Sequence, residues 1–265
     1  MSKGHRSGSA AAYRADRDNR TSYEVLFEFR GASYDRAMRL FPDARREEFL
    51  LPIGRSNLPP GATVADVPSH GGYLARYLPR GCRWLGHEPC AVFGHGAAGD
   101  DRGLLPLPWE DDAVDAALSV AGVHHVEDKV SLFRELARVV RPGGRFVLAD
   151  VHEASDAARF LDGWVDAHNS TGHDGLFLGE HTLDELARAG WRVLSAERVG
   201  YHWRFASLED MGEFCHGLFD LRASTPEETV RAIDEELGID RLEDGVGMRW
   251  ELYMVVAEPA APLVD

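Results

Sequence analysis

Cysteine and long apolar runs are both scarce in this chain of 265 residues. The three cysteines, Cys82, Cys90 and Cys215, form no CxxC pair, and their odd number argues against a disulfide framework. Reduced thiols in a cytoplasm fit this usage best. No apolar run approaches the roughly 18 residues that a membrane helix needs, and no signal-peptide stretch is seen at the N-terminus. These absences predict a cytoplasmic protein that does not enter a membrane.

Positive charge is scarce as well. The chain has 29 basic and 44 acidic residues and a formal net charge of −15, so a nucleic-acid backbone would be repelled. Residues 1–20 are mildly basic and rich in Gly, Ser and Ala, which predicts a disordered tail. The 12 histidines lack HxxxH and HExxH spacing. Adjacent His124 and His125 should point in different directions on a regular element, so no metal site is expected.

Residues 21–60 have apolar residues at helical spacing, with Pro42 as a break, and are expected to form an N-terminal helical lid segment. Residues 61–265 then alternate between strand and helix patterns, which predicts an α/β domain with helices on both faces of a mostly parallel sheet. The clearest helix spans 127–141 and precedes Pro142-Gly143-Gly144. A helical insertion is expected at about 202–247. Strands are expected at 62–67, 82–88, weakly within 91–101, and at 113–120, 145–151, 191–199 and 249–259.

Polar residues follow several of these strands. Asp66 ends the first strand and precedes the turn VPSHGG, whose backbone N–H groups would face the carboxyl edge of the sheet. Glu88 ends the second strand about 22 residues later, an offset suited to accepting hydrogen bonds from both hydroxyls of a ribose. Asp101 lies beside the ring end of such a ligand. The segment 117–128 would line the opposite wall of the crevice.

Together these segments resemble the class I S-adenosylmethionine-dependent methyltransferases over about residues 62–151. VADVPSHGGYL is similar to the first motif of the family and GHEP to its ribose-binding segment, while RELARVVRPGG is the most specific piece. The resemblance implies a Rossmann-like sheet of seven strands, the last one antiparallel, with S-adenosylmethionine as the cofactor. It places Asp66, Pro68, Ser69, His70, Gly71 and Gly72 around the amino-acid half of the cofactor, Glu88 on the ribose, Pro89, Asp101 and Arg102 at the adenine, and Ser119 and Val120 at the methionine end.

The first turn departs from the family pattern, which usually has glycines where Pro68 and His70 stand. His70 occupies the central position, where the cofactor comes close to the backbone. If the residue accepts a left-handed conformation, its ring can swing aside and even donate to the cofactor carboxylate. Otherwise the imidazole fills the pocket. Gly71 and Gly72 leave the backbone freedom to adjust.

Two hypotheses follow for function. The first is methyl transfer to an O, N or C atom of a small organic acceptor, with His124 or His125 as the candidate general base. The second is a methyltransferase-like fold that has lost methyl transfer and catalyses a cofactor-independent reaction or only binds a ligand or partner. A lid rich in aromatic residues and histidines suits a small molecule with a flat or apolar portion. Its candidate residues are Tyr23, Tyr34, Trp164, His173, His202, Trp203, Phe214 and His216.

Overall fold

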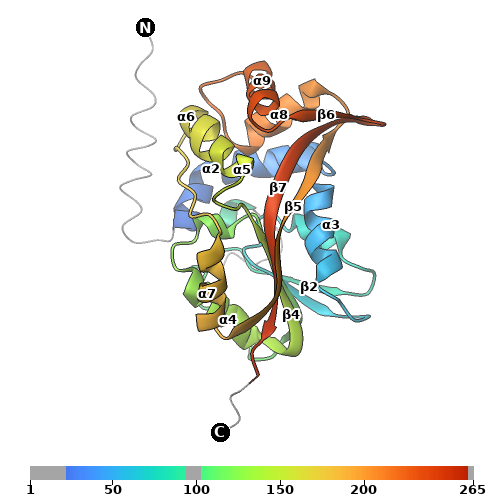
Figure 1. Ribbon diagram of the computed structural model, residues 1–265, viewed down its shortest axis with the longest axis vertical. Helices are drawn as coiled ribbons and strands as arrows, with labels where there is room; N and C mark the ends of the chain where they lie inside the picture. The colour runs from blue at the N-terminus through green and yellow to red at the C-terminus, as the bar shows by residue number, and fades with distance from the viewer. Residues whose placement is uncertain (1–21, 94–102, 262–265) are drawn as a thin grey trace.

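A computed structural model describes residues 22–93 and 103–261 of the chain. Its centre is a mixed sheet in the order β2-β1-β3-β4-β7-β5, with β6 paired to β7 (Figure 1). The strands β2, β1, β3 and β4 run parallel, whereas β7 runs antiparallel to β4, β5 and β6. The bounds are β1 (Thr63–Asp66), β2 (Arg83–Gly86), β3 (Val114–Val120), β4 (Val140–Asp150), β5 (Trp191–Phe205), β6 (Ile239–Leu242) and β7 (Gly245–Pro259).

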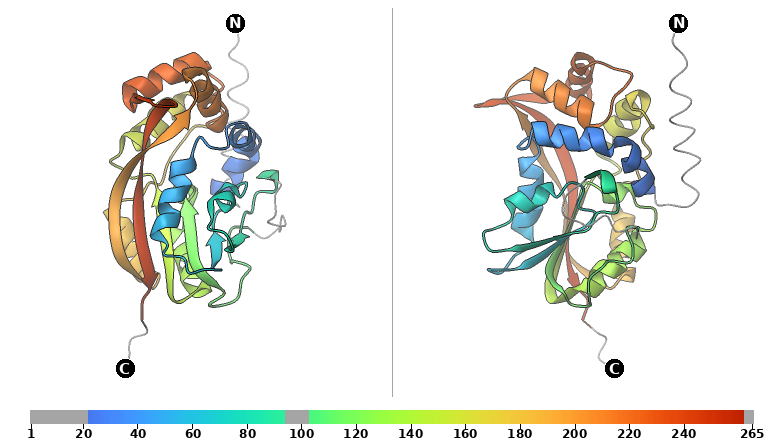
Figure 2. Two further views of the ribbon diagram at one scale, coloured as in Figure 1. Left: turned by 90° about the vertical axis from the view of Figure 1, so that its right-hand side faces the viewer. Right: turned by 180° about the vertical axis from the view of Figure 1, so that it is seen from behind.

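Helices cover both faces of this sheet (Figures 1 and 2). On one face lie α4 and α7, which also contact each other, and on the other lies α3. The α-helices are α2 (Ser22–Leu40), α3 (Arg46–Arg55), α4 (Lys129–Val139), α5 (Asp156–Phe160), α6 (Asp166–His168), α7 (Glu180–Arg188), α8 (Leu208–Leu218) and α9 (Pro226–Glu236). A π-helical turn, Leu161–Val165, joins α5 to α6, and short 3-10 helices span Tyr73–Tyr77, Ala91–Phe93 and Val123–His125. None of the helices described has both the length and the apolar character to cross a bilayer.

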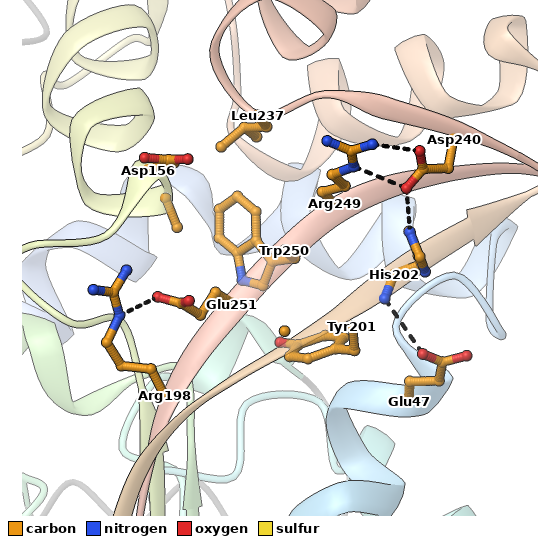
Figure 3. A pocket seen from close by; sticks show the side chains of 12 residues that line it. Glu47, Asp156, Arg198, Tyr201, His202, Leu237, Asp240, Arg249, Trp250 and Glu251 are labelled. Atoms are coloured by element: carbon orange, nitrogen blue, oxygen red, sulfur yellow. Dashed lines mark hydrogen bonds and ion pairs between the residues drawn. The ribbon is translucent and has the colours of Figure 1, made fainter.

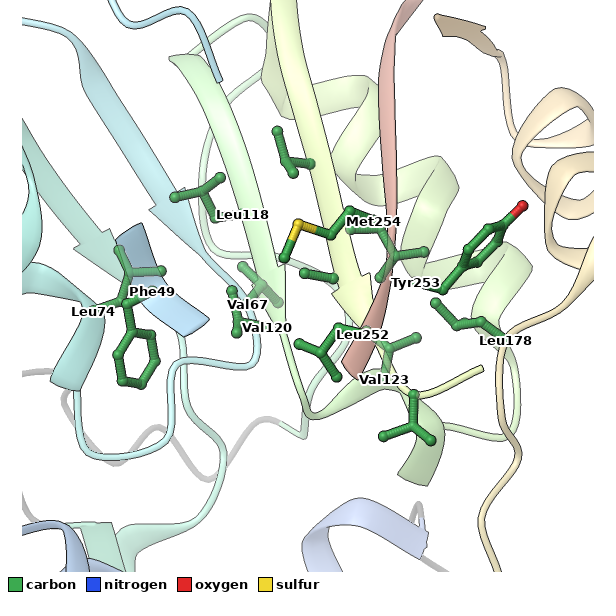
Figure 4. Packing of buried hydrophobic residues seen from close by; sticks show 14 of the residues in the cluster. Phe49, Val67, Leu74, Leu118, Val120, Val123, Leu178, Leu252, Tyr253 and Met254 are labelled. Atoms are coloured by element: carbon green, nitrogen blue, oxygen red, sulfur yellow. The ribbon is translucent and has the colours of Figure 1, made fainter. Parts of the chain in front are cut away.

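The core forms where apolar side chains of the strands meet the covering helices. Figure 4 shows Leu118 and Val120 of β3 and Leu252 and Met254 of β7 within the cluster of apolar side chains, and all four are almost fully buried. Burying a leucine or valine side chain contributes roughly 1.5–3 kcal/mol each. On α4, Leu132, Phe133, Leu136 and Val139 make a fully buried stripe, which explains why its periodicity is so clear in the sequence.

The lid above the sheet is built from two distant parts of the chain. Helix α2 packs on α8, and Figure 2 shows the two helices side by side. Ser33 Oγ donates to the carbonyl of Gly217 at 2.7 Å, and a Cβ on Gly217 would lie 3.3 Å from the Cβ of Ala37. The small residues thus allow the two helices to approach closely.

Several local expectations need correction. Within the weak strand expected at 91–101, Ala91–Phe93 are a 3-10 helix and the rest lies outside the described residues. The expected helical insertion at 202–247 contains α8 and α9, but β5 continues to Phe205 and β6 and β7 form a hairpin. The tail at 1–20 also lies outside the described residues.

Candidate functional site

The carboxyl ends of the four parallel strands bring the predicted polar residues to one edge of the sheet. Asp66 ends β1, Glu88 follows β2, Val120 ends β3 and Asp150 ends β4. Open α/β sheets bind ligands outside this edge, where neighbouring strands connect in opposite directions. The edge has two sides, one at the ends of β1 and β2 and one at the ends of β3 and β4.

The turn after β1 adopts the backbone that a glycine would give. His70 has φ of 48° and Gly72 has φ of 71°, both in the left-handed region, which histidine enters at some cost. The Val67–Pro68 peptide is cis. Ser69 N–H donates to the His87 carbonyl at 2.9 Å, and Gly72 N–H to the Ser69 carbonyl at 2.9 Å. These bonds fix the turn against the end of β2.

The imidazole of His70 does not swing aside but points into the molecule. It is 6 % exposed and stacks on Tyr34 at 5.4 Å between ring centroids, with Tyr23, Phe27 and Phe93 edge-on at 5.7, 5.1 and 5.6 Å. Burial, and then the charges of Arg45 and His124, lower the pKa of His70 to about 3. The ring is therefore neutral near pH 7. Its Nε2 has no hydrogen-bond partner among the described residues.

Glu88, the expected ribose ligand, already accepts hydrogen bonds from other groups of the chain. Its Oε2 accepts from the Tyr23 hydroxyl at 2.6 Å and from the His70 N–H at 2.7 Å, and its Oε1 accepts from the Cys90 N–H at 2.9 Å. Burial raises the pKa of Glu88 to about 7, against the opposing hydrogen bond from Tyr23. Helix α2 thus supplies, through Tyr23, one of the donors that a ribose would supply.

Asp66 lies beside Glu88 at the end of the neighbouring strand. Its Oδ2 accepts from Trp84 Nε1 at 3.0 Å. Burial raises the pKa of Asp66 to about 8, and the charge of Glu88 adds to the rise. Two carboxyl groups therefore share a buried site and hold protons near neutrality.

The other predicted cofactor residues differ in their surroundings. Ser119 and Val120 are buried beside the turn, and Ser119 Oγ donates to the Val67 carbonyl. Gly71 is crowded, since a Cβ there would lie 2.4 Å from the Tyr73 ring. Pro89 is half-buried. Asp101 and Arg102 lie outside the described residues.

Space decides whether these donors can hold S-adenosylmethionine. The cavity beside Asp66, Ser69 and His70 measures about 10 Å³, whereas ligand pockets usually measure roughly 300–1,000 Å³. The donor set fits the cofactor: two strand-end carboxyls, a glycine-containing turn, and a buried Ser69 Oγ with no hydrogen-bond partner in the described part of the chain. The volume fits only if the aromatic side chains of α2 move away.

The second side of the edge is organised around Asp150. This buried carboxylate accepts from the backbone N–H groups of Val123, His124 and Val151 at 2.7, 3.0 and 2.7 Å. Its Oδ1 lies 2.6 Å from His124 Nδ1. Burial alone would raise the pKa of Asp150, but the charge and hydrogen bond of His124 outweigh it and lower the pKa. Asp150 therefore positions His124, much as a carboxylate orients a catalytic imidazole.

His125 and His173 complete a cluster of three imidazoles with His124. Ring centroids lie 4.0 Å apart for His124 and His125, 5.7 Å for His124 and His173, and 5.3 Å for His125 and His173. Burial and the two neighbouring histidines lower the pKa of His125 well below its usual value. Burial lowers the pKa of His173 to about 4, although the hydrogen bond to Asp162 opposes the shift. The expectation that adjacent His124 and His125 diverge is wrong, because both lie in a 3-10 turn.

A cavity of about 50 Å³ lies against this cluster. Its wall combines residues of the lead-in segment, the β3 and β4 ends and the lid: Phe27, Arg30, Tyr34, Arg45, Ala121, His124, His125, Val151, Leu161, His173, Trp203, Leu218, Phe219 and Trp250. Of the lid residues expected from the sequence, Tyr34, His173 and Trp203 line it, whereas Phe214 is packed in the core. His216 instead lies 3.0 Å from the Ser224 carbonyl.

Arg45 is the main residue that the sequence does not point to. It lines both cavities, lies over the Trp203 ring at 5.1 Å, and makes a buried ion pair with Glu48. Glu48 in turn accepts from Trp203 Nε1 at 2.5 Å. This network ties α3 to β5 behind the cavities.

A further hollow of about 540 Å³ borders Trp250 (Figure 3). Each of its charged side chains has an ion-pair partner. Asp240 bonds both Arg249 and His202, and Arg198 bonds Glu251. Such paired surface charges leave little electrostatic attraction for a ligand, so the strand-end edge is the better candidate site.

Known methyltransferases are similar to the central segment of the chain. The family model described as a methyltransferase domain matches residues 98–148. An uncharacterized methyltransferase of Mycobacteroides abscessus is 34 % identical over 102 residues, which cover 34 % of this chain and 39 % of that protein. The methyltransferase GfsG of Streptomyces halstedii is 42 % identical over 47 residues, covering 18 % of this chain and 17 % of its own length. The matched part is thus well under half of these relatives.

Solved structures extend the likeness to most of the chain. The [4+2]-cyclase SpnF gives a TM-score of 0.52 at 22 % identity over 80 % of each chain. A chain from a complex of the Haloferax volcanii Trm112 methyltransferase activator with a methyltransferase gives 0.54 at 19 % identity, over 88 % of this chain and 96 % of that one. By its fold and by the sequence of its central segment, the chain is similar to the class I S-adenosylmethionine-dependent methyltransferases.

Proposed function

We propose that the protein transfers the methyl group of S-adenosylmethionine to an O, N or C atom of a small organic acceptor. The observation that carries the proposal is the joint placement of Asp66 and Glu88 at the ends of neighbouring strands, with the histidine-lined cavity next along the same edge. The cofactor supplies an electrophilic methyl group. The chain supplies alignment of the two reactants, which accounts for much of the rate in such displacements.

Each side of the edge has its own task in this proposal. Glu88 accepts hydrogen bonds from the ribose hydroxyls once the Tyr23 hydroxyl has left its Oε2 atom. Asp66 and the turn from Ser69 to Gly72 hold the amino-acid half. His124, oriented by Asp150, is the group placed to take a proton from the acceptor. The aromatic wall of the cavity, including Phe27 and Trp203, excludes water from the acceptor.

Binding requires α2 to open, because its side chains fill the cofactor side. Tyr23, Phe27 and Tyr34 all contact His70, and Tyr23 bonds Glu88. If only the open state binds the cofactor, the apparent affinity of the protein is its intrinsic affinity multiplied by the fraction of molecules that are open. We therefore expect weak binding to the wild-type protein and tighter binding when the closed state is destabilised.

A titration with S-adenosylmethionine and S-adenosylhomocysteine tests the proposal. His70→Gly keeps the left-handed backbone without strain and removes the ring, so it should bind both compounds at least about tenfold more tightly than the wild type. Adding Glu88→Gln to that variant should weaken binding again by roughly tenfold, because the amide accepts fewer hydroxyl donors. No binding by any of the three proteins would refute methyl transfer.

The second candidate function is a cofactor-independent reaction, or the binding of a ligand or partner, by a methyltransferase-like fold that has lost methyl transfer. The specific observation in its favour is the buried His70 ring, which occupies the cofactor side together with α2. One structural neighbour is a [4+2]-cyclase. The same titration separates the two functions: binding by His70→Gly but none by the wild type would favour the second.

A further inference from the structure

The three imidazoles of His124, His125 and His173 lie as the ligands of a metal ion would. Each residue offers a ring nitrogen, and these atoms all lie within 4.8 Å of one another. Nitrogen ligands of a tetrahedral zinc ion, at bonds of about 2.0–2.1 Å, lie roughly 3.3 Å apart. Small rotations of the rings close that difference. The three residues come from two segments, the turn after β3 and the loop before α7, that meet only in the folded chain.

Two of the rings are held by carboxylates in the manner of metal ligands. Asp150 Oδ1 lies 2.6 Å from His124 Nδ1, and Asp162 Oδ1 lies 2.8 Å from His173 Nδ1. An ionised carboxylate only accepts hydrogen bonds, so each Nδ1 carries the proton. The Nε2 lone pair of each ring is then available for a metal. Metal-binding histidines almost always use their second nitrogen in this way, which fixes both tautomer and orientation.

The two carboxylates also compensate the charge of a buried cation. A divalent ion with three neutral ligands brings two positive charges into a buried site, which is costly without compensation. Asp150 is fully buried and Asp162 half-exposed, and each lies one imidazole away from the candidate centre. Together they supply two negative charges at that distance.

We propose that His124, His125 and His173 bind one divalent first-row transition metal, with zinc as the first candidate, and leave one position open toward the cavity. Three protein ligands with an open fourth position are typical of catalytic rather than structural sites. The open position faces the cavity of about 50 Å³, so it would take an oxygen of the acceptor molecule. With the metal bound, the ring nitrogens are ligands, and the acceptor is activated by the metal instead of by His124.

This inference does not rest on methyl transfer, and its test needs neither cofactor nor acceptor. The full-length protein is stripped with EDTA and titrated with Zn²⁺ by calorimetry and with Co²⁺ by visible absorption. We expect one ion per chain and the intense absorption bands of four-coordinate Co²⁺. His125→Ala and His173→Ala should each weaken binding by at least about 100-fold. Asp162→Asn should weaken it by about 10- to 100-fold, because the carboxylate orients His173.

His202→Ala is the matched control. Its ring also lies beside a carboxylate, with Nε2 2.9 Å from Asp240 Oδ2, but it is not part of the cluster. It should bind metal as the wild type does. Absence of binding by the wild type, or equal affinity in the wild type and His173→Ala, would overturn the proposal. Circular dichroism checks that each variant folds, and the mainly exposed Asp162→Asn site provides the test should a histidine variant fail to fold.

Discussion

The two sides of the strand-end edge are built alike but filled differently. On the side of β1 and β2, Glu88 is satisfied by Tyr23, His70 and Cys90, and about 10 Å³ remains empty. On the side of β3 and β4, the polar groups are organised by Asp150 and face a cavity of about 50 Å³. On the first side the polar groups bond one another and little space remains, whereas on the second side the oriented histidines face an open cavity.

The difference lies in what covers each side. The aromatic side chains of α2 cover the β1 and β2 ends through ring contacts and one hydroxyl, all of which can be broken by moving a single helix. Asp150 is held by three backbone N–H groups of its own and the neighbouring turn. We infer that the first side changes between open and closed states, while Asp150 and the turn after β3 stay fixed, although Phe27 and Tyr34 of α2 also line the second cavity.

The largest expected effect is on the fixed side. Asp150→Ala leaves three buried N–H groups and His124 without their acceptor, so it should lower the free energy of unfolding by about 3–5 kcal/mol. Urea unfolding measures the change. Asp156→Ala, at the exposed start of α5, removes a carboxylate of the neighbouring segment and should change stability by less than about 0.5 kcal/mol. Equal losses in both variants would contradict a special role for Asp150.

A smaller effect is expected at the closing contact of α2. Tyr23→Phe removes the hydroxyl that donates to Glu88 and should cost about 1 kcal/mol of stability. If α2 is the cover of the cofactor side, the same change shifts molecules to the open state and strengthens S-adenosylmethionine binding by up to roughly fivefold. Calorimetry measures the affinity.

Tyr77→Phe is the control for that prediction, because its exposed hydroxyl bonds Pro42 and Asp43 away from both cavities. It should leave the affinity unchanged. Loss of stability in Tyr23→Phe without any gain in affinity would show that α2 does not limit access.

A further expected effect is a dependence of stability on pH that comes from the closed side. The folded pKa of Asp66, about 8, lies above its ordinary value, so the folded state holds the proton that the unfolded state loses. The stability from this group is complete below about pH 4 and is lost as pH rises toward 8. The melting temperature of Asp66→Asn should therefore fall less steeply between pH 5 and 8 than that of the wild type.

His70 should act in the opposite direction at lower pH. Its folded pKa, about 3, lies below its ordinary value, so the unfolded state takes up a proton that the folded state refuses. Stability from the buried neutral ring is lost as pH falls below about 6.5. A His70→Gln variant should lose less stability than the wild type between pH 6.5 and 4, and identical acid limbs would contradict the buried neutral ring.

The sequence predicted the features that depend on local patterns and strand order. The apolar run of β3 and the stripe of α4 identify those elements, and parallel strands bring Asp66 and Glu88 together. Helix α4 ends at Val139, before the end expected at 141, and β4 already begins at Val140. The strand expected within 91–101 was wrong for residues 91–93. These residues have a β-rich composition but form a 3-10 helix that packs against α2.

What the sequence did not predict depends on contacts between distant segments. Tyr23 meets Glu88 only because α2 folds back over the edge of the sheet. His173 joins His124 because a loop of the lid returns to the turn after β3, where Leu176 N–H donates to the His124 carbonyl at 2.8 Å. The direction of the His70 ring is likewise set by four aromatic neighbours, not by its own turn.

The long hairpin of β5 and β7 has a consequence for how the chain can diversify. Its two strands pair from Trp191 with Pro259 to Phe205 with Val246, with one register shift between Val193 and Ser195, and α8 and α9 are inserted at its far end. Leu218 and Phe219 reach the cavity from this insertion. Exchanging the insertion between homologous chains would therefore change the part of the cavity wall that α8 contributes. The strand register, and with it the rest of the fold, would stay in place.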